Sequence, residues 1–283
     1  MKNLFKKIMS LSLASMMLLA VGCGSSSSSS SKAENSGAVN SGEDTSLQQV
    51  MDAGKLVLGL DPTFKPMGYT DENDQIVGFD IDVAQEVCSR MGIELETYSV
   101  NWDTKEQDLN AGTIDCIWNG LSVSDKRKEE MLLSDPYMKN DMIFLVNNDS
   151  GISSQADLEG KVVAVQNGST AQEILNSSDL VTSGSVVVME LATNVEAIQQ
   201  LELELADAVF LDLVVAEYEI TSTGKDMTVL PDGLQAEEYA IGFRKGDEAL
   251  CNKIEETMKE MVADGTMADI STKWFGKDVC TIE

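Results

Sequence analysis

The sequence predicts an α/β fold in two lobes, each built on a mostly parallel sheet flanked by helices. Over residues 55–118, short apolar runs alternate with amphipathic segments, which is the strand–helix order of a parallel sheet. The same order begins again after residue 140. In addition, residues 109–120 and 201–212 share a leucine, an aspartate six positions later and then an apolar stretch, so the two halves resemble each other weakly.

In the first half, residues 55–61 form an apolar run that ends at Asp61–Pro62, as a strand followed by a turn does. The spacing of apolar residues predicts a helix over 80–92, with Asp80 as its N-cap and Gly92 closing it. The alternating segment 93–100 predicts a strand. A short helix over 103–112 and a buried strand over 113–118 complete this half. The predicted helix 80–92 has four residues on its apolar face: Val83, Ala84, Val87 and Met91.

In the second half, three apolar runs predict strands, and the segments between them predict helices. The segment after the turn at 230–233 predicts a strand and a turn, and a long helix then places Leu250, Ile254, Met258 and Met261 on one face. In open α/β sheets, ligands bind beyond the carboxyl ends of strands. The polar residues at two such ends, Asn119–Gly120–Ser122 and Asp212, therefore indicate a cleft between the lobes. The three predicted strands are 161–166, 185–190 and 207–212.

The first 46 residues indicate how the chain is held in place. Lysines at positions 2, 6 and 7 precede a short apolar stretch that ends in small residues before Cys23, the pattern of a lipoprotein signal peptide over residues 1–22. A membrane-spanning anchor is the alternative, but the apolar stretch is well short of the roughly 20 residues that a spanning helix needs. Cleavage would leave Cys23 carrying lipid such as palmitate. The serine-rich segment 23–46 is expected to be a disordered tether.

Composition excludes several classes of function. With 48 acidic and 20 basic residues, the net charge of -28 disfavours binding to nucleic acid or to anionic lipid. The chain has no histidine, which removes the Ser–His and Cys–His nucleophile pairs. Without histidine or a CxxC pair, we expect no metal site and no cofactor. Cys88 and Cys116 are expected in the core, and the sequence leaves open whether Cys251 and Cys280 pair.

Arg127 is the strongest single indication of a binding site. The chain has only three arginines, and this one follows the hydroxyl residues Ser122 and Ser124. A guanidinium can grip a carboxylate through two parallel hydrogen bonds, which a lysine cannot do. A second candidate anion site is the turn Gly168–Ser169–Thr170, which precedes a predicted helix. Each of these features alone also fits an ordinary surface residue or helix cap.

The chain resembles the family 3 solute-binding proteins, the amino-acid receptors of ABC importers. The resemblance covers nearly all of residues 47–276, and the motifs come in the family's order and at its spacing. It departs at Glu204–Leu205, where the family has a Gly–basic turn, and at Gly120, where a hydroxyl residue is common. Six segments carry the resemblance: GFDIDVAQEV (78–87), AGTIDCIWNGLSVSDKRKE (111–129), LLSDPY (132–137), VAVQNGST (163–170), DAVFLD (207–212) and YAIGFRKGDEAL (239–250).

The resemblance implies a type II periplasmic-binding-protein-like fold. Lobe 1 would comprise residues 47–140 and 234–283, and lobe 2 residues 141–233. Crossover segments near 138–145 and 233–241 would act as the two-segment hinge. The protein would bind a free L-amino acid, dock on membrane permease subunits and work as a monomer. It would be held by its lipid on the extracellular face of the cell membrane, or on the periplasmic side if there is an outer membrane.

The resemblance also assigns roles to residues. Arg127 and Ser122, with the strand end at Asn119–Gly120, would bind the ligand carboxylate, and the turn from the other lobe would complete this site. Asp212 would pair with the ligand ammonium. Trp118 is a further candidate, although a tryptophan that ends a buried strand is usually core. The other residues expected to bind the ligand are Asp61, Phe64 and Trp102 around its side chain, and Gly168, Ser169 and Thr170 in the turn.

The sequence therefore predicts a non-enzymatic receptor that captures a polar or basic amino acid by hinge closure. Two alternatives stay open. The first alternative is an enzyme on the same fold, because some relatives of the family are dehydratases. In such an enzyme, Asp212 or Glu173 would act as a general acid. The second alternative is a sensing module that presents its ligand to a signalling partner.

Overall fold

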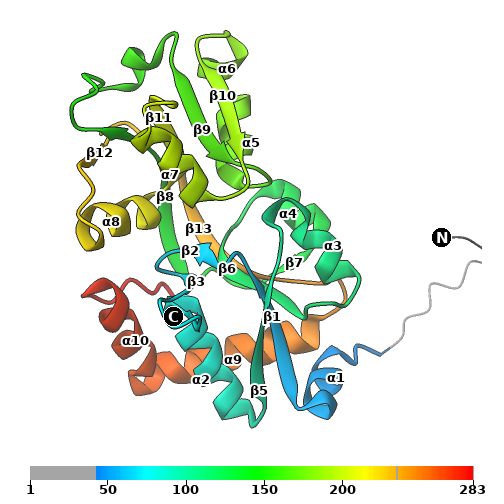
Figure 1. Cartoon of the computed structure of the whole chain (residues 1–283). Coiled ribbons are helices and arrows are strands. Elements are labelled where there is room, and N and C mark those ends of the chain that lie inside the picture. Colours follow the sequence, from blue (N-terminus) through cyan, green and yellow to red (C-terminus); the bar gives the residue numbers. More distant parts are fainter. Residues whose placement is uncertain (1–42, 234, 283) are drawn as a thin grey trace, which may run out of the picture. The chain divides into compact units, whose positions relative to one another are not determined.

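The computed structural model describes residues 43–233 and 235–282 (Figure 1). The described residues, from Glu43 onward, form one compact unit. The expected signal peptide, Cys23 and the tether up to residue 42 thus lie outside the described residues. Among the helices of the described part, none is both long enough and apolar enough to span a bilayer.

One mixed sheet of ten strands runs through the unit, in the order β10-β9-β11-β8-β13-β6-β1-β5, with β12 paired to β8 and β7 to β13. A small second sheet has the order β2-β3-β4. The strands of the large sheet are β1 (Lys55–Leu60), β5 (Glu94–Ser99), β6 (Cys116–Ser122), β7 (Leu132–Leu133), β8 (Met138–Asn147), β9 (Val162–Gln166), β10 (Val187–Leu191), β11 (Ala208–Asp212), β12 (Met227–Val229) and β13 (Gln235–Phe243). Those of the small sheet are β2 (Thr63–Phe64), β3 (Gly68–Thr70) and β4 (Ile76–Val77).

The large sheet has a parallel set of strands at each end and an antiparallel pair in its middle. Strand β1 pairs in parallel with β5 and β6, and β9 pairs in parallel with β10 and β11. The middle strands β8 and β13 are antiparallel, with Met138–Met142 facing Gln235–Tyr239. This ladder lies within the segments that the sequence predicts as crossovers. Each parallel set therefore belongs to one half, and β8 and β13 join the halves.

Helices cover the sheet as the alternation of the sequence predicts (Figure 1). The long helix α9 buries Leu250, Ile254, Met258 and Met261, as expected from their spacing. The helices are α1 (Ser46–Ala53), α2 (Phe79–Met91), α3 (Lys105–Asn110), α4 (Asp125–Glu130), α5 (Thr170–Ser177), α6 (Asp179–Thr182), α7 (Asn194–Glu202), α8 (Leu213–Ser222), α9 (Glu248–Asp264) and α10 (Thr266–Phe275), with 3-10 turns η1 (Trp102–Thr104) and η2 (Gln155–Leu158).

Helix α2 has the predicted buried face and ends at Gly92, which has the left-handed conformation of a C-cap. The predicted N-cap is wrong, because α2 begins at Phe79 after Gly78 and Asp80 lies inside its first turn. The fully buried Asp80 carboxylate instead accepts hydrogen bonds from the Gly120 amide (2.8 Å) and the Tyr137 hydroxyl (2.9 Å). Burial raises the pKa of Asp80 to about 7. Asp80 thus fixes the end of β6 against α2.

The four described cysteines are all free thiols. Cys88 and Cys116 are fully buried core residues, as predicted. Cys251 and Cys280 are free thiols, so the structure does not contain the disulfide that the sequence left open. Trp118 is also fully buried, with its ring centroid 6.5 Å from that of Tyr137, and belongs to the core of the first half.

Candidate functional site

The carboxyl end of β6 brings three of the predicted site residues together. Asn119 is buried, and its side-chain oxygen accepts a hydrogen bond from the Asp61 amide at 3.0 Å. Its Nδ2 has no hydrogen-bond partner in the described part of the chain. Gly120 has φ 59°, and a Cβ there would lie 2.7 Å from the Phe64 ring. A side chain in place of Gly120 would therefore require Phe64 to shift, besides the strain of the left-handed backbone.

Arg127 lies in the short helix α4 and is buried, with 5% of its surface exposed. Ser124 caps α4 by accepting a hydrogen bond from the Arg127 amide. The guanidinium Nη1 donates to the Ser122 carbonyl at 2.8 Å. No carboxylate of the described residues forms an ion pair with Arg127, whereas Arg90 and Arg244 pair with two acids each. Desolvation lowers the pKa of Arg127, as expected for a buried cation without a counter-ion.

Lys105 is a buried cation that the sequence did not single out. Its ammonium donates to the Trp102 carbonyl (2.9 Å) and to the Gly168 carbonyl (3.1 Å), and pairs with Glu106 at 2.8 Å. It also lies 4.8 Å from the centre of the Trp102 ring, a cation–π distance. Burial lowers the pKa of Lys105 to about 8, and the nearby Arg127 charge acts in the same direction. Lys105 thus ties Trp102 to the Gly168 turn of the other half.

The turn before α5 contacts the first half directly. Gly168 has φ 66°, and a Cβ on it would lie 2.5 Å from the Asp103 Cα atom. Ser169 caps α5 by accepting from the Gln172 amide (3.0 Å) and donates to the Gln166 carbonyl (2.7 Å). The buried Thr170 hydroxyl has no partner among the described residues. Of the three predicted turn residues, Thr170 therefore keeps the uncommitted hydroxyl, and Gly168 allows the close approach.

Asp212 ends β11, and its carboxylate is buried with 5% of the residue exposed. Oδ1 accepts hydrogen bonds from the Tyr239 hydroxyl (2.6 Å) and from Asn140 Nδ2 (3.0 Å). The side chain does not cap α8, although it stands at the N-cap position. Burial raises the pKa of Asp212, while the Arg127 charge opposes that rise. Arg127 and Asp212 are therefore both buried and sense each other's charge.

Glu237 in β13 is a second buried acid beside Asp212, and the sequence did not predict it. Asn140 Nδ2 donates to Glu237 Oε1 at 2.6 Å as well as to Asp212, so one amide joins the two carboxylates. Burial, with the neighbouring Asp212 charge, raises the pKa of Glu237 to about 8. The sequence does contain a signal that could have identified Glu237. It is an acid two residues before Tyr239, so it shares the buried face of the strand with that tyrosine.

Asp61 bridges the two halves rather than standing free. Its Oδ1 accepts from the Thr63 amide (2.9 Å) and hydroxyl (2.7 Å), and its Oδ2 accepts from Gln166 Nε2 at 2.8 Å. Gln166 belongs to β9 of the other half, so it has a structural role that the sequence did not show. Lys126 of α4 makes a further contact between the halves, at 2.6 Å from Glu173 of α5. The predicted residues of the two halves therefore converge.

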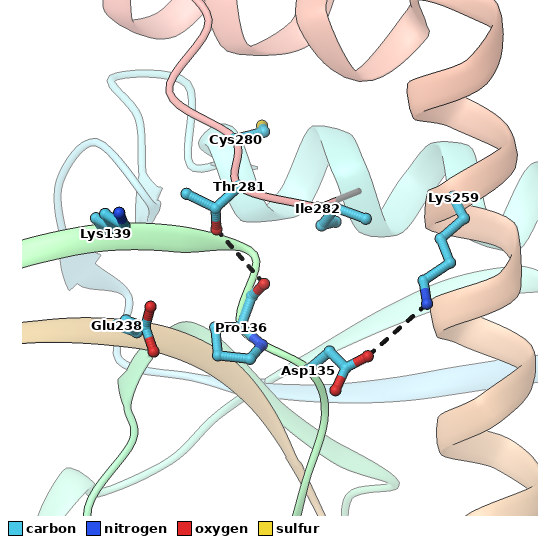
Figure 2. A pocket seen from close by; sticks show the side chains of 8 residues that line it. All are labelled: Asp135, Pro136, Lys139, Glu238, Lys259, Cys280, Thr281 and Ile282. Atoms are coloured by element: carbon cyan, nitrogen blue, oxygen red, sulfur yellow. Dashed lines mark hydrogen bonds and ion pairs between the residues drawn. The ribbon is translucent and has the colours of Figure 1, made fainter.

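A surface hollow of about 740 Å³ lies at the outer side of the β8–β13 ladder (Figure 2). None of the predicted site residues lines it. Its charges are mixed, and Lys259 is 3.8 Å from Asp135. Because strand residues alternate between faces, Lys139 and Glu238 in this hollow point away from Asn140 and Glu237. The lining residues are Asp135, Pro136, Lys139, Glu238, Lys259, Cys280, Thr281 and Ile282.

Comparison with known proteins identifies the class. Residues 56–277 match the bacterial extracellular solute-binding proteins, family 3, and the chain belongs to this family. The L-cystine-binding protein TcyJ of Escherichia coli strain K12 is 29% identical over 235 residues, which are 82% of this chain and 87% of TcyJ.

Two solved structures share the fold at high similarity. The structure of Tv2483 bound to L-arginine has a TM-score of 0.81 and 30% identity, and the match covers 85% of this chain and 98% of that one. A substrate binding protein of an ABC uptake transporter from Streptococcus pneumoniae, with bound histidine, has a TM-score of 0.78 and 34% identity. That match covers 84% of this chain and 98% of the other. The predicted type II, two-lobed fold is therefore confirmed.

Proposed function

We propose that this protein captures a free L-amino acid outside the cell by closing its two lobes and delivers it to the permease of an ABC importer. The observation that carries this proposal is a buried guanidinium, Arg127, that pairs with no carboxylate of the described chain. Burying an unpaired charge is costly, so the site favours a ligand that brings an anion. The relatives are binding proteins whose names give cystine, arginine and histidine as ligands.

The ligand's two charged groups fit the two lobes. The carboxylate would bind Arg127, with the hydroxyl groups of Ser122 and Thr170 and the Asn119 amide as further donors. The ammonium would pair with Asp212. Phe64 and Trp102 would pack against the side chain, and Asp61 with Gln166 would form the polar end of that pocket. This arrangement suits a polar or basic amino acid.

The ladder of β8 and β13, which joins the halves, supports a hinge at this place. We assign lobe 1 to residues 47–140 and 234–283, and lobe 2 to 141–233. A ligand that bonds both lobes favours the closed state because only that state offers all the contacts at once. The contacts of Lys105 with the Gly168 carbonyl and of Lys126 with Glu173 would then form on closure and break on release.

The N-terminal pattern supports a lipid anchor on Cys23 and a monomer tethered to the extracellular face of the membrane by the serine-rich segment. If so, the membrane fraction of cells that express the full chain yields a protein beginning at a diacylglyceryl-modified Cys23, read by mass spectrometry. In Cys23→Ser, that modification is absent and the protein leaves the membrane fraction. Equal membrane retention of the variant would contradict the anchor.

A thermal-shift screen of the common amino acids tests the function and its main rival. We expect at least one to raise the midpoint of unfolding, through linkage of binding to folding. Recovery of this amino acid, unchanged after long incubation, distinguishes a receptor from a dehydratase-like enzyme. A new product would favour the enzyme, and no shift with any amino acid would overturn the proposal.

Arg127→Lys should weaken binding of the amino acid selected by the screen by roughly 2 kcal/mol or more, because lysine cannot form the bidentate pair. Isothermal titration calorimetry measures the difference. Arg90→Lys is the matched control, since Arg90 pairs with Glu86 and Asp264 elsewhere. Near-normal affinity in Arg127→Lys would remove this residue from the site.

Gly168→Ala should hinder closure, because the new Cβ would meet the Asp103 backbone. Gly160→Ala is a close control: Gly160 has φ 75° but nothing within 4 Å of the added Cβ. Both variants should lose about 1–2 kcal/mol of stability, because alanine is strained in the left-handed conformation. Only Gly168→Ala should lose affinity and show less compaction with ligand in small-angle scattering. Equal behaviour of the two variants would argue against this contact.

A further inference from the structure

Two buried carboxylates share a single amide on the hinge ladder. Asn140 of β8 donates through one nitrogen to Asp212 of β11 and to Glu237 of β13, at 3.0 and 2.6 Å. Three strands that are far apart in the sequence thus meet at this point. No lysine or arginine of the described residues forms an ion pair with either acid. Within the described chain, the cluster is therefore a pair of acids with no cation in direct contact.

One buried oxygen of this pair lacks a partner. Glu237 Oε2 is buried and has no hydrogen-bond partner in the part of the chain that the structure describes, and only 7% of the residue is exposed. A buried acceptor without a partner is costly, so the site favours a group that donates to this oxygen. A donor that also carries positive charge would satisfy both the oxygen and the uncompensated pair.

The direction of the side chain follows from the strand. Glu237 and Tyr239 are two residues apart and therefore lie on one face of β13, and Tyr239 reaches Asp212 from there. Glu238 lies on the opposite face, in the outer hollow, where its side chain is drawn beside Pro136 (Figure 2). Glu237 is thus on the side of Asp212, Asn140 and the Ser122 strand end.

We propose that Glu237 is a second carboxylate for the ligand's ammonium group, acting beside Asp212 in the same site. The proposal rests on the proposed amino-acid function. It extends the single acid that the family resemblance implies, and it adds a residue that the sequence did not identify. A three-donor ammonium can bond both acids at once, one through Asp212 and one through the free Glu237 oxygen.

The groups around Glu237 set the proton balance of binding. Asp212 faces it from β11, Asn140 from β8, Ser122 from β6 and Tyr239 from its own strand, and Arg127 of α4 is close enough to sense its charge. Two adjacent buried carboxylates do not both ionise without a cation, so the empty pair retains a proton. Arrival of the ammonium favours ionisation of both acids and releases this proton. Affinity therefore rises with pH up to the pKa of the empty pair.

Glu237→Gln tests this, with Glu238→Gln as the matched control on the opposite, exposed face. The probes are L-arginine with 5-guanidinopentanoate, and L-glutamine with 4-carbamoylbutanoate; another amino acid selected by the screen is paired with its own deaminated acid. Calorimetry in two buffers of different ionisation enthalpy gives both the Kd and the protons released between pH 6 and 8.5.

We expect the wild type and Glu238→Gln to bind the amino acid about tenfold more tightly at pH 8.5 than at pH 6, with proton release. Glu237→Gln should bind the amino acid at pH 8.5 no more tightly than at pH 6, and should release no proton on binding. The deaminated acids should bind all three proteins without this gain. Equal losses for both members of a probe pair, or an unchanged pH profile, would overturn the inference. Failure of the wild type to bind any common amino acid would instead overturn the proposed function.

Discussion

The site depends on opposite charges that are buried close together but do not satisfy each other. Arg127 lies on the first half, Asp212 ends strand β11 of the other half, and Glu237 lies on β13, one of the two strands that join the halves. Each would be costly alone, because transfer of a charge from water into a protein interior is penalised by several kcal/mol. In the proposed site, the carboxylate and the ammonium of a zwitterion would offset this penalty for the guanidinium and for the acids. The arrangement therefore favours ligands that carry both charges.

The proposed hinge and the proposed ammonium site use the same strands. The ladder between β8 and β13 joins the halves, and Asn140 and Glu237 face each other across it as ladder partners. Asp212 of β11 pairs in turn with Met142 of β8. In the proposed function, a ligand cation held by this cluster would act at the strands that join the halves. Binding and closure would then be coupled by position.

Sequence reasoning could predict the strand ends, because the carboxyl ends of parallel strands collect at one edge whatever their side chains contact. That rule gave Asn119, Gly120 and Asp212. It could not give Lys105 or Glu237, whose roles depend on partners 63 and 97 residues away. The prediction that Asp80 is an N-cap is wrong for the same reason. An aspartate before an apolar helix resembles an N-cap locally, but here its carboxylate is buried and accepts a hydrogen bond from the Gly120 amide, 40 residues away. Local pattern carries no information about such contacts.

The charge balance of the site bears on which amino acids it can accept. The Asp61 carboxylate accepts hydrogen bonds from the neutral donors Thr63 and Gln166, and Lys105 forms an ion pair with Glu106. The groups left to the ligand are one guanidinium and two carboxylates. When a neutral amino acid binds and both acids ionise, the three groups keep one negative charge in excess of the guanidinium. A ligand with a second cation removes that excess and so stabilises the ionised pair further. Basic amino acids should therefore gain on neutral ones as pH rises, a preference set by Glu237 and not by the shape of the pocket.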